Sequence, residues 1–287
     1  MQLNPLDIIF WTFRRNEKDV VNLYNTLSPV MQLAVGGDML NFGYWENGST
    51  TPIAAQQELC SKVGKLGELD SAENMIDVGS GVAGPARFWS GEYPELDIIC
   101  INTNFTQLQN AVSGKNLERI NQHNSTSANF PFASDSIDRV IALESAQHFK
   151  DFDSFISESK RVLKNNGILV IAIPVARKFE DSLMKLGILS FTWSSEHYST
   201  DFIKTKLKDH NLEIMEIDSI GEKVYSPLTK FYTENRNGIR QNLNSVFPSY
   251  LEKILYKSLL KMKEVSESKT IDYVLIKCRK VSSSNTS

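Results

Sequence analysis

The sequence predicts an α/β fold in which helices cover both faces of a mostly parallel sheet. From Asn74 onward, short apolar runs alternate with amphipathic stretches. Parallel strands need long crossover connections, which helices supply. The run GILVIAIP at 167–174 is apolar throughout, as is typical of a strand buried on both faces. These two patterns predict the fold class.

Two helices are predicted before the sheet. Residues 17–35 carry a broad apolar stripe that includes Val20, Leu23 and Tyr24. In 52–69 the apolar residues also recur near helical spacing. A loop rich in glycine and aromatic residues, GGDMLNFGYWENGST, joins the two predicted helices.

The alternation of strands and helices continues to residue 280. Strands are expected at 75–80, 97–102, 137–145, 167–174, 211–220 and 271–280, and helices at 85–93, 105–114, 151–163 and 201–210. Thr200 is the expected cap of the last helix, which ends at Asn211, a residue that tolerates left-handed backbone. The polar segment 121–132 is interpreted as a connection.

A helical block is expected between the last two strands. Five apolar residues share one face of its second half: Leu251, Ile254, Leu255, Leu259 and Met262. Lys253, Lys257 and Lys261 lie elsewhere on that helix. A solvated lysine face is favoured over contact with an anionic membrane surface.

Composition excludes several classes of protein. The 287 residues carry a formal net charge of -3, which argues against general attraction to nucleic acid. No run approaches the roughly 18 apolar residues of a membrane span, and the N-terminus lacks the charge order of a secretory signal. The three cysteines, Cys60, Cys100 and Cys278, show no CxxC spacing. Buried free thiols and a cytoplasmic location are therefore expected.

The most informative segment is the glycine-rich turn that follows the first expected strand. It reads Asp77-Val-Gly79-Ser-Gly81-Val-Ala-Gly84. Glycines allow positive φ and close approach of a ligand to the backbone, and the N-terminus of the following helix suits a carboxylate or a phosphate. The glycine spacing alone also fits a dinucleotide-binding loop.

Two positions separate these readings of the turn. A dinucleotide site needs an acid at the end of the second strand to bind the ribose, and Asn102 stands there. The acid lies before the first glycine instead, at Asp77, where a carboxylate can orient the loop or attract an ammonium group. The simpler alternative is that Asp77 only hydrogen-bonds its own turn.

Four segments in order resemble the class I S-adenosylmethionine-dependent methyltransferases. They are IDVGSGVAGPA, ICINTNFTQLQNA, ANFPFASDSIDRVIALESAQHF and RVLKNNGILVIAIP, within about 74–174. The resemblance implies a Rossmann-like, doubly wound, seven-stranded sheet with a helical lid. The expected division is an N-terminal cap with a Gly-Tyr-Trp loop (1–70), a cofactor-binding core (71–224), a lid insertion (225–265), a last core strand (266–280) and a disordered tail (281–287).

The resemblance also implies the residues that bind S-adenosylmethionine. The backbone at Gly79 and Gly81 would face its methionine part, with Asp77 behind them. Asn102 would bind the ribose, where the family usually has an acid, with Gln107 nearby. The full set of expected cofactor residues is Tyr24, Asn41, Gly43, Asp77, Gly79, Gly81, Asn102, Thr103, Gln107, Thr126, Ser127 and Leu143. Thr126 and Ser127 stand where the family usually has an acid for the adenine.

His148 and Glu144 are the expected catalytic residues. They follow the strand at 137–145, at the sheet edge where ligands bind in open α/β folds. Histidine accepts a proton near neutral pH, as O-methylation requires. Glu144 would orient His148, bind an amine or act as the base itself. Helix capping by His148 is the structural alternative. No cluster has the spacing of metal ligands.

Aromatic residues are the expected acceptor contacts. Tyr44 and Trp45 lie in a segment that resembles the Gly-Tyr-Trp loop of small-molecule methyltransferases, and Phe231, Tyr232 and Arg236 lie in the expected lid. Aromatic walls suit a partly apolar acceptor such as a polyketide, terpenoid, sterol or quinone. Transfer to oxygen or carbon is favoured, and transfer to nitrogen stays open. Core packing is the alternative role of these aromatics.

Two other functions remain open at this point. A non-catalytic relative that binds the cofactor would explain the departures at Asn102 and Thr126. An NAD-dependent oxidoreductase is disfavoured by the missing acid of the second strand. The oligomeric state is also open, with a homodimer as one alternative.

Overall fold

The computed structural model describes residues 17–46, 50–112, 118–177, 186, 189 and 196–281. Expectations for the first 16 residues and for the tail after Val281 lie outside the described residues. The chain divides into two compact units, and each is described by itself. The sheet unit comprises 60–173, 199–219 and 274–287, and the helical unit comprises 1–59, 174–198 and 220–273.

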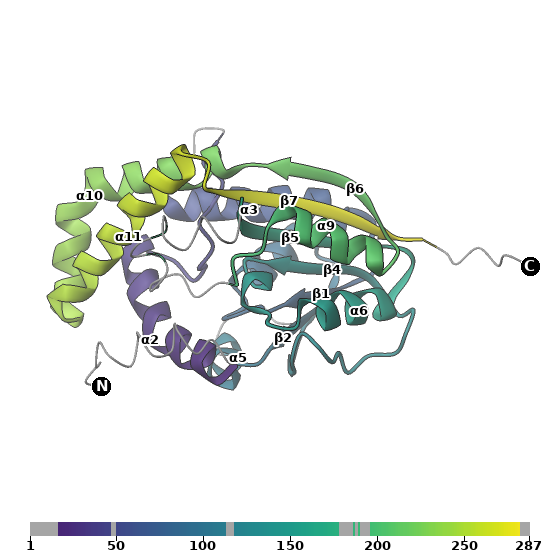
Figure 1. Cartoon of the computed structure of the whole chain (residues 1–287). Helices are drawn as coiled ribbons and strands as arrows, with labels where there is room; N and C mark the ends of the chain where they lie inside the picture. Colours follow the sequence, from purple (N-terminus) through teal and green to yellow (C-terminus); the bar gives the residue numbers. More distant parts are fainter. Residues whose placement is uncertain are drawn as a thin grey trace, which may run out of the picture. The chain divides into compact units, whose positions relative to one another are not determined.

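A seven-stranded sheet, with the strand order β3-β2-β1-β4-β5-β7-β6, is the centre of the sheet unit (Figure 1). The first five strands pair in parallel, and β6 pairs antiparallel with β7. The predicted α/β fold with a mostly parallel sheet is confirmed. The bounds are β1 (Asn74–Val78), β2 (Asp97–Asn102), β3 (Ile120–Asn124), β4 (Ile137–Leu143), β5 (Leu163–Ala176), β6 (Leu212–Ser219) and β7 (Ile271–Lys280).

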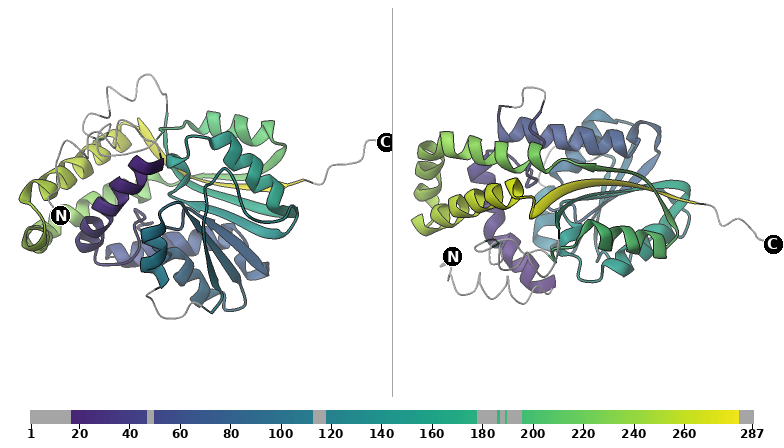
Figure 2. Two further views of the ribbon diagram at one scale, coloured as in Figure 1. Left: turned by 90° about the horizontal axis from the view of Figure 1, so that it is seen from below. Right: turned by 45° about the horizontal axis from the view of Figure 1, so that its top comes forward.

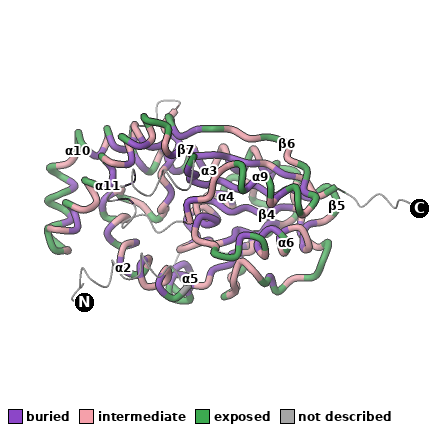
Figure 3. Tube along the Cα trace, viewed as in Figure 1, coloured by how far each residue is buried: buried purple, intermediate pink, exposed green. Residues whose placement is uncertain are grey.

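Helices cover the two faces of this sheet. Figure 2 shows α6 and α9, in teal and green, on one face and α4, in blue, on the other. Because both faces are covered, the central strands β1, β4 and β5 are buried over most of their length (Figure 3). The bounds are α4 (Gly84–Glu92), α5 (Phe105–Val112), α6 (Phe152–Val162) and α9 (Thr200–Asp209).

The structure corrects several expected boundaries. Residues 120–124, which sequence reasoning took as part of a polar connection, form β3 in parallel with β2. β3 lies at the sheet edge, where polar side chains are tolerated, so apolar patterning missed it. Ser199, not Thr200, caps α9, because its Oγ accepts a hydrogen bond from the Phe202 amide. Asn211 does adopt the expected left-handed backbone.

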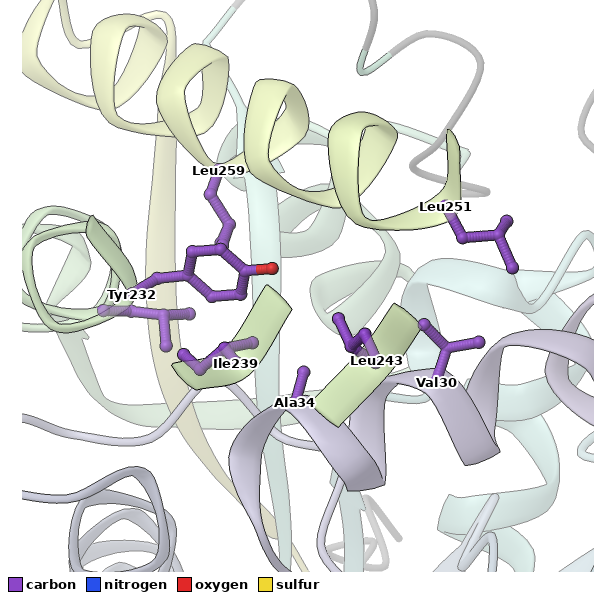
Figure 4. Close-up of a cluster of buried hydrophobic side chains, with 8 residues drawn as sticks. Val30, Ala34, Tyr232, Ile239, Leu243, Leu251 and Leu259 are labelled. Atoms are coloured by element: carbon purple, nitrogen blue, oxygen red, sulfur yellow. The ribbon is translucent and has the colours of Figure 1, made fainter. Parts of the chain in front are cut away.

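Three helices build the core of the helical unit: α2 (Glu17–Val35), α10 (Tyr225–Val246) and α11 (Ser249–Glu267). Figure 4 shows Val30 and Ala34 of α2 with Leu243 of α10 and Leu251 and Leu259 of α11. These side chains belong to one buried hydrophobic cluster, which explains the apolar stripes on the three helices. α3 (Pro52–Leu66) begins in the helical unit and ends in the sheet unit.

Candidate active site

The glycine turn joins β1 to α4 with two glycines at positive φ. Gly79 has φ 76° and Gly81 has φ 57°. The amides of Gly79 and Ser80 donate to the carbonyl of Ile101 on β2, with N···O distances of 2.7 and 3.1 Å. A Cβ at Gly79 would lie 2.5 Å from the Cβ of Ser145, whereas a Cβ at Gly81 would meet nothing within 4 Å. Packing therefore requires Gly79, and the backbone at Gly81 stays open to a ligand.

Asp77 lies buried at the end of β1, with an exposed fraction of 2%. Its Oδ2 makes no hydrogen bond to any residue that the structure describes. Burial raises the pKa of Asp77 from 3.8 to about 7. A cationic group placed beside this carboxylate would favour its charged form. The site is thus suited to the ammonium of an amino-acid ligand.

The side chain of Asn102 connects β2 to the glycine turn. Its Nδ2 donates to the carbonyl of Gly81 at 3.1 Å and to Oε1 of Gln107 at 3.0 Å. Its Oδ1 accepts from the amide of Asn104 at 3.3 Å. The structure therefore brings Asn102 and Gln107 together, as expected from the sequence. It also gives the side chain of Asn102 three hydrogen bonds within the protein, which were not predicted when Asn102 was assigned to the ribose.

Asn104 is a functional position that sequence reasoning missed. Its Oδ1 accepts a hydrogen bond from the amide of Gln107 at 3.2 Å, which caps α5. An Asn followed three residues later by Gln resembles the capping-box pattern, so Asn104 to Gln107 carried a signal. The cap fixes the helix that presents Gln107 to Asn102.

Replacing Asn102 with aspartate separates a structural role from a ribose contact. In the protein, the new carboxylate oxygen faces the Gly81 carbonyl and Oε1 of Gln107, two acceptors, so we expect the turn to loosen. The Kd for S-adenosylhomocysteine should rise roughly tenfold, measured by calorimetry. Asn121→Asp, at an exposed position of β3, is the matched control. Tighter binding by Asn102→Asp would show that ribose recognition dominates.

Residues after β3 lie at the same edge of the sheet. Nδ2 of Asn124 donates to the carbonyl of Thr103 at 3.1 Å, which ties β3 to the end of β2. Thr126 Oγ1 accepts from the amide of Ala128 at 3.3 Å, and Ser127 is half-buried. These two residues follow β3 in the chain, and their contact with the cofactor stays a prediction.

The end of β4 turns sharply beside the glycine turn. Leu143 is buried, and Glu144 adopts left-handed backbone with φ 50°. The Glu144 amide donates to Ala172 on β5 at 2.8 Å, and Ser145 Oγ donates to the carbonyl of Val78 on β1 at 2.5 Å. Ser145 thus anchors this turn to β1, a role that sequence reasoning missed.

His148 ends the short 3-10 helix Ala146–His148 that follows this turn. Its amide donates to the carbonyl of Ser145 at 2.9 Å, and its Nε2 lies 3.2 Å from Nε2 of Gln147. Ser145 contacts Gly79 of the glycine turn. The structure therefore brings Glu144 and His148, which lie close to Ser145 in the chain, into the neighbourhood of this turn.

The Gly-Tyr-Trp loop is fixed within the helical unit by backbone contacts. A Cβ at Gly43 would lie 2.7 Å from the Cβ of Ala55 on α3. Asn41 Oδ1 accepts from the Gly43 amide at 3.1 Å, and Gln56 Nε2 donates to the Asn41 carbonyl at 2.9 Å. The Trp45 amide donates to the Lys223 carbonyl at 2.8 Å. Gln56 of α3 is a further residue that holds this loop, and the sequence did not reveal it.

The expected acceptor aromatics divide into buried and half-buried residues. Trp45 and Phe231 are half-buried, with ring centroids 5.6 Å apart. Tyr44 is buried, and its hydroxyl donates to Glu46. Tyr232, with an exposed fraction of 3%, belongs to the hydrophobic cluster of the helical unit (Figure 4).

Arg236 was expected to line an acceptor pocket, and the structure shows that it also pairs with a buried carboxylate. Its guanidinium donates to both carboxylate oxygens of Glu252, at 2.8 and 3.2 Å, and lies 3.6 Å from the centroid of the Tyr256 ring. Glu252 has an exposed fraction of only 1%. The pair links α10 to α11 and compensates a buried charge.

Arg236→Lys should therefore weaken the α10–α11 contact. Lysine keeps the charge but loses the two-point geometry and the stacking on Tyr256. We expect the free energy of unfolding to fall by about 1–2 kcal/mol, measured by denaturant titration. Lys230→Met, which removes an exposed pair with Glu234 at 4.0 Å, should change it by less than about 0.5 kcal/mol. Equal effects of the two substitutions would contradict this role.

All three cysteines are buried free thiols, as expected. Within the described ranges, no group of three His, Cys, Asp or Glu side chains could hold a metal ion. The described helices also include none that is long and apolar enough to cross a membrane.

Comparison with known proteins decides between the ligands that a glycine turn can bind. Residues 76–171, from within β1 through most of β5, match the methyltransferase-domain family. The chain carries a methyltransferase domain and is an S-adenosylmethionine-dependent methyltransferase. The methyltransferase is 26% identical over 215 residues to methyltransferase GfsG of Streptomyces halstedii, covering 72% of this chain and 77% of that one.

Two further similarities cover nearly the whole methyltransferase. The erythromycin 3''-O-methyltransferase of Saccharopolyspora erythraea is 22% identical over 292 residues, covering 94% of this chain and 92% of the relative. The crystal structure of the mycolic acid cyclopropane synthase CmaA1, complexed with SAH and CTAB, has a TM-score of 0.76 at 15% identity. That likeness covers 90% of this chain and 95% of that one, and it shows the shared fold.

The residues at the glycine turn fit S-adenosylmethionine. The open backbone side of Gly81 leaves room for a ligand, and the Oδ2 of Asp77 can receive an ammonium group. Neither feature serves a pyrophosphate, which a buried carboxylate would repel. The site of this methyltransferase therefore agrees with its family.

Proposed function

We propose that this methyltransferase acts on a hydroxyl oxygen of a small, partly apolar natural product such as a polyketide. The proposal is supported by the turn after β4, where Ser145 packs against Gly79 and the His148 amide donates to the carbonyl of Ser145. The name of the erythromycin relative, an O-methyltransferase, supports the same reaction class.

S-adenosylmethionine, when bound, supplies a methyl carbon made electrophilic by its sulfonium. The backbone of Gly79 and Gly81, with Asp77, would hold its methionine part. A neutral hydroxyl is a weak nucleophile, so loss of its proton during the reaction lowers the barrier. His148 is the residue that we propose to accept this proton. We propose that Glu144 orients the acceptor or His148 from the same turn.

We propose that aromatic residues contribute the apolar acceptor contacts. Trp45 and Phe231 form a half-buried aromatic pair, which suits the hydrocarbon part of a polyketide or terpenoid. Tyr44 and Tyr232 are more deeply buried, and we propose that they support this pair. The net charge of -3 supports an acceptor that is not a nucleic acid, and a cytoplasmic location remains part of the proposal.

The test is product formation with paired acceptors. The protein is incubated with S-adenosylmethionine and a panel of macrolides that carry free hydroxyls, each compared with its methyl ether at that hydroxyl. We expect S-adenosylhomocysteine and a new methyl ether from at least one free hydroxyl, with none from its blocked partner. Methylation that requires an amine or an activated carbon and ignores hydroxyls would overturn the proposal.

A further inference from the structure

We propose that Gln147 is a positioning residue that selects the tautomer of His148 in which Nε2 can accept a proton. The inference rests on the proposed role of His148 as a general base. Gln147 is 3% exposed and lies within the 3-10 helix Ala146–His148. Neither composition nor the family resemblance singled it out.

The main-chain carbonyl of Glu144 fixes the orientation of the Gln147 amide. Nε2 of Gln147 donates to this carbonyl at 2.7 Å. A carbonyl oxygen accepts and never donates, so the opposite orientation would place two acceptors against each other. The Oε1 of Gln147 is buried and has no hydrogen-bond partner among the described residues. The contacts of Nε2 therefore set the orientation.

This orientation of the amide favours one tautomer of neutral His148. The same Nε2 of Gln147 lies 3.2 Å from Nε2 of His148. Because an amide nitrogen only donates, Nε2 of His148 is the acceptor, and the neutral ring carries its proton on Nδ1. The other tautomer would bring two N–H groups into contact at this distance.

The selected tautomer is the one that a general base at Nε2 needs. The lone pair of His148 Nε2 accepts a hydrogen bond from the Gln147 amide until the hydroxyl of the methyl acceptor replaces that donor. The O–H bond then breaks, its proton forms a new N–H bond at Nε2, and the electron pair stays on the acceptor oxygen. Gln147 also closes the turn at Glu144, whose backbone is left-handed (φ 50°).

Two substitutions test the inference. Gln147→Glu keeps the shape but offers only acceptors, so Nε2 of His148 should gain a proton. Gln147→Met keeps the length and removes the donor, so the two tautomers should mix. We expect both to lower kcat by about tenfold or more, with little change in KM or in the Kd for S-adenosylhomocysteine.

The decisive readout is NMR of the protein labelled with ¹⁵N-histidine, with His148→Ala used to assign the signals. The unmodified protein should show His148 protonated on Nδ1, and Gln147→Glu should show protonation at Nε2. A wild-type Nε2–H tautomer, or unchanged signals and kcat in both variants, would overturn the inference. If His148→Ala instead keeps full turnover, the proposed base fails, while the tautomer signals still report on Gln147.

Discussion

Turnover of a hydroxyl acceptor should fall by about 10²–10⁴-fold when His148 is replaced by alanine, the usual contribution of a general base. The backbone of the glycine turn is untouched, so the affinity for S-adenosylhomocysteine should stay the same. The expected change is therefore in kcat. Steady-state kinetics at several pH values, together with a calorimetric Kd, measure both quantities.

A second histidine provides the control for this substitution. His210 pairs with Asp153 at 3.2 Å between α9 and α6, far along the chain from the turn after β4. His210→Ala should leave kcat unchanged. If His148→Ala keeps wild-type turnover, or if both variants lose turnover equally, His148 is not the base, and Glu144 becomes the next residue to test.

Asp77→Asn should change cofactor binding and stability in opposite directions. The folded state raises the pKa of Asp77 from 3.8 to about 7, so the folded chain holds this proton more tightly than the unfolded chain. The carboxyl therefore destabilises the fold as pH rises, and the full effect is present above about pH 7. A pKa difference of one between the two states corresponds to about 1.4 kcal/mol, which gives an upper limit of roughly 4 kcal/mol.

The measurement compares unfolding free energies without cofactor at about pH 4.5 and about pH 8. The Asp77→Asn variant has no carboxyl to ionise at this position, so it should gain stability relative to wild type as the pH rises. Its Kd for S-adenosylhomocysteine at about pH 8 should be at least about tenfold higher, since the ammonium group of the ligand loses its carboxylate partner. Asp70→Asn, at an exposed site, is the control. A pH-independent stability difference would show that Asp77 is ionised in both states.

The sequence predicted the parts of the fold in which burial sets the pattern. β2 and β7 were expected at 97–102 and 271–280 and begin and end there. β3 was missed because INQHN lies at the sheet edge, and a polar edge strand has no apolar alternation to reveal it. The Ser199 cap was displaced by one residue because Ser199 and Thr200 are both good capping residues.

The site could be located from the sequence, but its internal hydrogen bonds could not. The glycine turn and Asp77 could be recognised because these residues are neighbours in the sequence. Ser145, Gln147 and Gln56 carry no such signal, since each acts through a carbonyl or ring that only the fold brings near. The ion pair of Arg236 was missed for the same reason, because its partner Glu252 lies on another helix.

Binding of S-adenosylhomocysteine to Gly81→Asn tests whether the glycine turn holds the cofactor. Asn tolerates left-handed backbone, and a Cβ at Gly81 meets no protein atom within 4 Å, so the fold should persist. Gly91→Ala on α4, where a Cβ also meets nothing within 4 Å, is the control. We expect wild type and Gly91→Ala to bind one equivalent by calorimetry and Gly81→Asn to lose most of this affinity. Equal binding by all three proteins, or no heat with wild type, would contradict this role of the glycine turn.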